Sequence, residues 1–93
     1  MMNRIELYQQ IVGDMEALYI AKNKDYGNSV GDTFDRYGLV SFLVRMEDKL
    51  NRLRTLNQSQ DASVKDEKIV DTLQDLANYA ILALIELKLK KEV

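Results

Sequence analysis

Residues 66–89 read DEKIVDTLQDLANYAILALIELKL, and this stretch decides the fold. It contains neither Gly nor Pro, so nothing in it interrupts a helix. A capping residue precedes this stretch, acids lie at its start and lysines lie at its end. These charges complement the helix dipole at both ends. We expect one helix over about 64–91, roughly 40 Å long, which exceeds the diameter of a compact domain this small and predicts a partner subunit. The end residues are Ser63, Asp66, Glu67, Lys88, Lys90 and Lys91.

This helix is expected to be covered on two sides. A stripe that begins polar and becomes apolar is not an ordinary solvated face. We therefore expect Asp71 and Asp75 to lie at an internal or intersubunit surface. The expected core face consists of Leu73, Leu76, Ala80, Ala83, Leu84 and Leu87. The second stripe consists of Glu67, Asp71, Asp75 and Asn78, followed by Leu82, Ile85 and Leu89, which could pair with a second copy or another partner.

Two further amphipathic helices are expected earlier in the chain, over residues 4–24 and 39–56. Asn3 and Glu6 resemble a capping box at the start of the first helix. Apolar residues recur at helical spacing in both segments. These residues are Ile5, Tyr8, Ile11, Val12, Met15, Leu18 and Tyr19 in the first helix, and Leu39, Phe42, Leu43, Met46, Leu50 and Leu53 in the second.

The segment between these two helices, residues 25–38, reads DYGNSVGDTFDRYG and is rich in turn formers. We expect a loop with at most one short helical turn near 33–37, serving either as a binding loop or as a plain crossover. The polar residues 57–63 should link the second and third helices. The predicted fold class is all-α: one domain over residues 1–93, with three principal helices completed by oligomerisation.

The composition restricts the chemistry. The 93 residues include no Cys and no His, which excludes disulfides, thiolate and imidazole metal ligands and the usual His base. Catalysis would have to use carboxylates, Lys, Arg, Tyr or a hard metal ion. The net charge of −2 argues against nucleic acid as a partner. No apolar run reaches the roughly 20 residues of a membrane helix and no signal peptide is apparent, so we expect a soluble cytoplasmic protein.

The acids Asp71 and Asp75 lie one turn apart and need a compensating charge if they are covered. This could be a hard cation such as Mg²⁺, which prefers carboxylate oxygen. Glu47 is expected to point partly inward from the second helix and to form an acidic cluster with them, whereas Asp48 turns further outward. The alternative is that the acids pair with basic residues, which the spacing supports equally. These residues are Arg45, Lys49, Arg52 and Arg54.

Two groups of cations could contact a ligand. Arg45, Lys49 and Arg52 form a row on what we expect to be the outer side of the second helix, where a solvated face is favoured over a phosphate site. The segment 22–28, KNKDYGN, brings two lysines, an amide, an acid and a ring together at a helix end. These residue types suit a base or phosphate contact, but composition alone favours a C-terminal cap with Gly27 at positive φ.

Three segments in order resemble the nucleotide modification associated domain 1 family, small proteins common in phages and bacteria. They are KNKDYGNS (22–29), RMEDKLNRL (45–53) and DEKIVDTLQDLANYAILAL (66–84), and the resemblance extends over about 5–87. That family is in turn similar to the MazG-like all-α nucleotide pyrophosphohydrolases. In those enzymes an ExxE motif and a later ExxD motif hold Mg²⁺, which activates water for attack at the α-phosphorus of a triphosphate.

The later motif is matched in part. Asp75 stands at the closing Asp of ExxD. Thr72 stands where the Glu is expected, and Asp71 is the nearest acid.

The earlier motif is also incomplete. Glu47 matches one Glu of ExxE, but Leu50 occupies the next motif position. The shifted pair, Asp48 with Asn51, departs from the pattern as well. The resemblance therefore allows a metal site that is rearranged, reduced to one ion, or lost.

Together these arguments predict a Mg²⁺-dependent nucleoside triphosphate pyrophosphohydrolase of a bacterial or phage-infected cell, acting as a dimer or tetramer and releasing a monophosphate and pyrophosphate. The alternative is an oligomeric helical module that binds a nucleotide or a partner protein without catalysis. The predicted catalytic residues are Glu47, Asp71 and Asp75, and Asp48 joins them as a predicted metal ligand. The predicted nucleotide contacts are Arg52 and, as the resemblance implies, Lys22, Asn23, Lys24, Asp25, Tyr26 and Asn78.

Overall fold

The computed structural model describes residues 1–26, 28–60 and 62–91. Helices occupy most of these ranges and no strand occurs in them, which confirms the all-α class. The described ranges contain four helices, one more than expected. None of the four combines the length and apolar character needed to cross a membrane. They are α1 (Arg4–Tyr26), α2 (Ser29–Tyr37), α3 (Val40–Gln58) and α4 (Ala62–Leu89).

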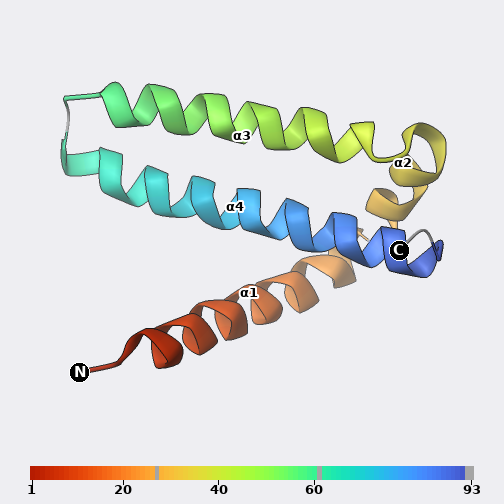
Figure 1. The fold of residues 1–93 in the computed structure, drawn as a ribbon, viewed down its shortest axis with the longest axis horizontal. Helices are drawn as coiled ribbons and strands as arrows, with labels where there is room; N and C mark the ends of the chain where they lie inside the picture. Colours follow the sequence, from red (N-terminus) through yellow and green to blue (C-terminus); the bar gives the residue numbers. More distant parts are fainter. Residues whose placement is uncertain (27, 61, 92–93) are drawn as a thin grey trace.

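The helices are arranged around the antiparallel pair of α3 and α4 (Figure 1). α2 packs across the end of this pair where α3 begins and α4 ends. α1 ends near this same end of the pair and diverges from α4 toward its own N-terminus, so its N-terminal half lies apart from the other helices. With 28 residues, α4 is about 42 Å long. This matches the longest dimension of the molecule, 41 Å.

The start of α1 is set by the predicted cap. The Glu6 backbone N–H donates to the Asn3 side-chain oxygen at 2.8 Å, and the Leu7 N–H donates to the Asn3 carbonyl at 3.0 Å. The Asn3 side chain thus satisfies a donor that the first helical turn leaves without an intrahelical partner, and its carbonyl accepts the first intrahelical hydrogen bond. The expected start at residue 4 is confirmed, and the helix extends two residues beyond the expected end.

α2 corrects the prediction for residues 25–38, because most of the expected loop is helical. The Phe34 ring is buried against Phe42 of α3, with ring centroids 5.9 Å apart. This packing stabilises a short helix whose composition alone favours turns. α2 ends at Tyr37, and the capping Gly38 has φ +69° and donates its N–H to the Phe34 carbonyl. The predicted cap at Gly27 lies outside the described residues.

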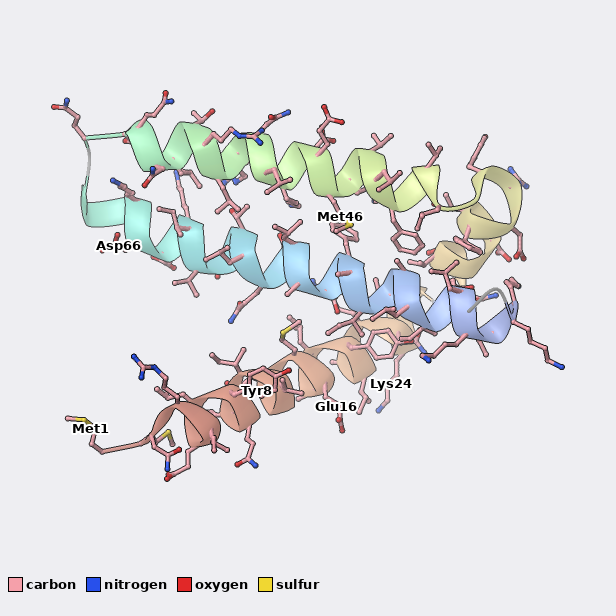
Figure 2. All side chains as sticks on the ribbon, in the orientation of Figure 1. Met1, Tyr8, Glu16, Lys24, Met46 and Asp66 are labelled. Atoms are coloured by element: carbon pink, nitrogen blue, oxygen red, sulfur yellow. The ribbon has the colours of Figure 1, made fainter. Side chains whose placement is uncertain are left out.

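The buried core is small and lies where α2, α3 and α4 meet. Its buried apolar members are Phe34, Phe42 and Ala83. Met46 packs against them, and Figure 2 shows its side chain between α3 and α4. The predicted core face of α4 is only partly covered, because Leu73 and Leu84 are each about half exposed. They lie beyond the arc of α4 that contacts α3, and none of the other helices in the described ranges covers them.

Candidate functional site

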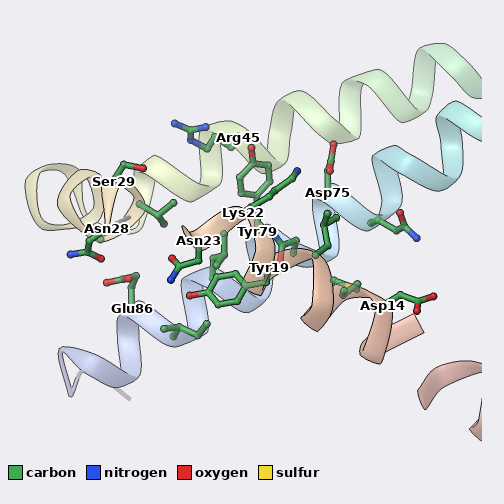
Figure 3. Close-up of a pocket in the computed structure, with 18 of the residues that line it drawn as sticks. Asp14, Tyr19, Lys22, Asn23, Asn28, Ser29, Arg45, Asp75, Tyr79 and Glu86 are labelled. Carbon is green, nitrogen blue, oxygen red and sulfur yellow. The ribbon is translucent and has the colours of Figure 1, made fainter. Parts of the chain in front are cut away.

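A cavity of about 930 Å³ lies between the C-terminal half of α1 and α4, with α2 and Arg45 of α3 closing one end (Figure 3). We call it the α1–α4 groove. Its α1 wall comprises Asp14, Met15, Leu18, Tyr19, Lys22 and Asn23. Its α4 wall comprises Asp71, Gln74, Asp75, Asn78, Tyr79, Leu82, Ile85 and Glu86, and the segment that begins α2 adds Asn28, Ser29, Val30 and Gly31.

Helical spacing explains why these side chains converge. On α1, Met15, Leu18 and Lys22 follow one another at intervals of three and four residues, so they share a face. The second stripe expected on α4 forms most of the opposite wall, although Glu67 and Leu89 do not line the groove. Its polar half and its apolar half therefore face one cavity.

The groove contains four kinds of chemistry. It has two cations, several carboxamides, two tyrosine rings and four acids. A cation–π contact links a cation to a ring: the Arg45 guanidinium carbon lies 5.9 Å from the centroid of the Tyr79 ring. The cations are Lys22 and Arg45, the carboxamides Asn23, Asn28, Gln74 and Asn78, the rings Tyr19 and Tyr79, and the acids Asp14, Asp71, Asp75 and Glu86.

A second polar region, the α3–α4 seam, is defined by Lys49 and Arg52 of α3 and Thr72 and Asp75 of α4. The Lys49 ammonium forms an ion pair with the Asp75 carboxylate at 3.1 Å. Arg52 Nε donates to the Thr72 hydroxyl at 3.3 Å, and that buried hydroxyl donates to the Lys68 carbonyl at 2.6 Å. The alternative of basic partners for the acids is therefore realised at Asp75.

The contacts in the seam show that the expected orientation of α3 is wrong. Lys49 and Arg52 face α4 rather than the outer side, and Arg45 lines the groove. The covered side chains of α3 include Phe42 and Lys49. The buried face of this helix is therefore rotated away from several of its leucines and toward the row of cations. Long basic side chains can enter such an interface because their stems are apolar.

The predicted acidic cluster does not form within the chain. Glu47 and Asp48 are exposed on α3 and do not line the groove. Asp71 and Asp75 do line it, one turn apart on α4. Across residues 1–26, 28–60 and 62–91, no three acidic side chains lie close enough to hold one metal ion. The rotation of α3 that brings Lys49 to Asp75 also turns Glu47 away.

The predicted nucleotide contacts separate into distinct places. Lys22, Asn23 and Asn78 line the groove. Lys24 is exposed and does not line it, and Arg52 belongs to the seam. The predicted side chains Asp25 and Tyr26 lie outside what the structure describes.

Sequence reasoning missed several groove residues. Glu86 is almost fully buried, and its signal is that it is the one acid in the apolar run AILALIELKL, residues 80–89. Asp14 and Tyr19 belong to α1, whose apolar spacing predicts an amphipathic helix but no binding site. Asn28, by contrast, belongs to segment 22–28, which is predicted to contact a base or phosphate, and it does line the groove.

Comparison with known proteins identifies a family. A family model described as nucleotide modification associated domain 1 matches residues 22–87. This range covers the C-terminal end of α1, all of α2 and α3, and nearly all of α4, so it includes both sides of the seam and the α4 wall of the groove. No significant match was found among curated proteins or solved structures.

Proposed function

Because this chain belongs to the nucleotide modification associated domain 1 family, we propose that the α1–α4 groove binds a nucleotide. One observation carries the proposal: cations, carboxamides and aromatic rings line one cavity. Its volume, about 930 Å³, falls within the range of roughly 300–1,000 Å³ that is usual for small-molecule sites. Each part of a nucleotide has a matching group in this cavity.

The base and the phosphates would use different groups. Tyr19 and Tyr79 offer ring faces on which a base can stack. The carboxamides of Asn23 and Asn78 can donate and accept hydrogen bonds, as the edge of a base requires. Lys22 provides a compact positive charge for the phosphates.

The charge of the groove determines the form in which a nucleotide would bind. Four acids and two cations line the groove, and Lys49 of the seam pairs with one of these acids, so the formal charge is −1 and a bare triphosphate would still be repelled. The described acids do not form a metal cage of their own. We therefore expect the nucleotide to enter as its Mg²⁺ complex, in which the metal offsets much of the phosphate charge.

Titration calorimetry with the common ribonucleoside and deoxyribonucleoside triphosphates in Mg²⁺ tests this proposal. Lys22→Gln should weaken binding about ten- to hundredfold, because a hydrogen bond to a charged group contributes about 1.5–3 kcal/mol. Lys24→Gln is the matched control, since Lys24 belongs to the same helix but does not line the groove. Equal losses in both variants, or no saturable heat with any nucleotide, would reject the groove as the site.

The expected role of the acids has a separate test. Asp71→Asn should strengthen the binding of Mg²⁺-free nucleotide, because it removes a negative charge from the groove, and should reduce the advantage that Mg²⁺ confers. Asp48→Asn makes the same change at an exposed position outside the groove and should alter neither affinity. If Asp48→Asn altered these affinities and Asp71→Asn did not, the result would favour Asp48 as a metal ligand, as the shifted ExxE motif predicts.

Hydrolysis of the bound nucleotide is a second candidate, supported by the position of Asp71 and Asp75 one turn apart on the groove wall. It is the reaction that the MazG-like resemblance implies. A pyrophosphate-release assay with Mg²⁺ and with EDTA measures it directly, and Asp75→Asn should abolish turnover without loss of helicity. Saturable binding without pyrophosphate release would leave a nucleotide-binding module as the function.

A further inference from the structure

The chain exposes more surface than a folded monomer of its size should. Its accessible area is 7501 Å², whereas a compact monomer of 10.7 kDa is expected to expose about 5,500 Å². The difference of about 2,000 Å² is well above the roughly 800 Å² that each partner buries in a stable dimer. Large apolar side chains on α1, α3 and α4 contribute to this exposed surface. The area is sufficient for association with another protein surface.

One exposed apolar stripe on α4 has an internal symmetry. It consists of Val70, Leu73, Ala77, Ile81 and Leu84, at intervals of three, four, four and three residues. The four large side chains are 53, 50, 42 and 52% exposed, in that order, and Ala77 is exposed as well. The order of intervals is the same in both directions from Ala77. None of the five residues lines the α1–α4 groove.

We propose that this stripe is the interface of a homodimer in which two α4 helices pack antiparallel across a twofold axis at Ala77. In this arrangement Val70 faces Leu84 of the second copy, and Leu73 faces Ile81 of the second copy. The small side chain of Ala77 at the crossing point allows the two helices to approach closely. A twofold interface requires a surface that complements itself, and the intervals of the stripe meet that requirement.

The charges at the ends of the stripe support the same arrangement. Asp66 and Lys88 lie at equal distances in sequence on either side of Ala77, about three helical turns away. Figure 2 shows Asp66 near the start of α4, at the end opposite the last turn that carries Lys88. An antiparallel pair places Asp66 beside Lys88 of the second copy at both ends, whereas a parallel pair would place like charges together.

The dimer surface differs from the one expected from sequence. Leu82 and Ile85 were predicted to pair with a second copy or a partner, but they line the groove. The proposed stripe lies on another side of α4 and includes Leu73 and Leu84, which were predicted to be core. The dimer therefore does not depend on nucleotide binding, and Lys22→Gln should leave it intact.

Sedimentation equilibrium of the full chain gives the first test. The wild-type protein should have about twice the mass of one 10.7 kDa chain. Ala77→Glu places two carboxylates together at the axis and should raise the dimer dissociation constant at least about a hundredfold. Ala17→Glu, the same change at an exposed position on α1, should have no effect. A monomeric wild type, or a dimer that tolerates Ala77→Glu, would overturn the proposal.

Cross-linking gives a test that does not depend on weakening the dimer. The chain has no cysteine, so Ala77→Cys introduces a single thiol that meets its own copy at the axis. Oxidation should convert this variant, but not Ala17→Cys, to a covalent dimer. Asp66→Lys should weaken the dimer, and adding Lys88→Asp to the same chain should restore it. Equal cross-linking at both positions, or no rescue by the double exchange in a chain of wild-type helicity, would count against the antiparallel arrangement.

Discussion

The α3–α4 seam and the α1–α4 groove use neighbouring residues of one helix in opposite ways. In the seam, Thr72 and Asp75 are joined to Arg52 and Lys49 across the helix pair. In the groove, Asp71 forms no ion pair or side-chain hydrogen bond with any residue that the structure describes. The difference follows from geometry, because α3 runs alongside α4 while α1 diverges from it. Polar groups are satisfied within the chain where helices touch and remain available to a ligand where they separate.

The largest expected effect removes the packing that both regions share. Phe42 is 2% exposed and its ring contacts Phe34 of α2, so Phe42→Ala should lower the free energy of unfolding by about 3–5 kcal/mol. Urea unfolding followed by circular dichroism measures this change. Leu43→Ala, at the next and half-exposed position, should cost far less. Similar losses in the two variants would mean that the phenylalanine pair is not the centre of the core.

A smaller effect should separate the seam from the groove. Thr72→Val removes a hydroxyl that links Arg52 to the Lys68 carbonyl, so it should reduce the free energy of unfolding by about 1 kcal/mol. It should leave nucleotide affinity unchanged. Asp71→Asn should do the reverse, with a change in unfolding free energy within about 0.5 kcal/mol and a clear change in affinity. If both variants altered affinity equally, the two regions would form one site.

The sequence predicts those parts of the fold that depend on local signals. The helix start at Asn3 and the length of α4 depend on local signals, namely a capping side chain and an uninterrupted helical pattern. α2 depends on Phe34 reaching Phe42, a contact that turn-rich composition conceals. Such a contact becomes visible only when the tertiary packing is known.

The candidate site was predictable to a lesser degree, because its composition depends on the rotation of each helix. Periodicity placed Asp71, Asp75 and Asn78 on one face, and they do share the groove. On α3 the leucines and the cations occupy neighbouring arcs, so sequence alone could not determine which arc meets α4. Because α3 is rotated toward the cations, Lys49 and not Glu47 lies at the seam.

Two helical glycines should respond differently to replacement by Ala, a change that can raise the free energy of unfolding by about 0.5–1 kcal/mol. Gly13 of α1 has no atom within 4 Å of the position a Cβ would take, so Gly13→Ala should raise the free energy of unfolding by that amount. Gly31 lines the groove, and a Cβ there would meet the side chain of Asn28, so Gly31→Ala should lack the gain. Thermal unfolding measures both. Adding Asn28→Ala to Gly31→Ala should recover the gain, and failure to do so would place the obstacle elsewhere.

The smallest expected effect is at the far end of α4, where the tie to α2 is solvent-exposed and not buried as in the seam. The Lys90 ammonium donates to Asp35 at 2.8 Å, and this hydrogen bond together with the Asp35 charge raises the pKa of Lys90 above its ordinary value of 10.5. A raised pKa in the folded state means that the pair stabilises the fold fully below pH 10.5 and loses this contribution as the pH rises through the folded pKa. An NMR titration of the Lys90 side chain should show the elevated pKa in the wild type. Asp35→Asn should return it toward 10.5, whereas Asp32→Asn should change it less, because Asp32 is the weakest of the contributing charges. An unchanged pKa in Asp35→Asn would show that the Lys90–Asp35 ion pair does not tie α2 to the end of α4.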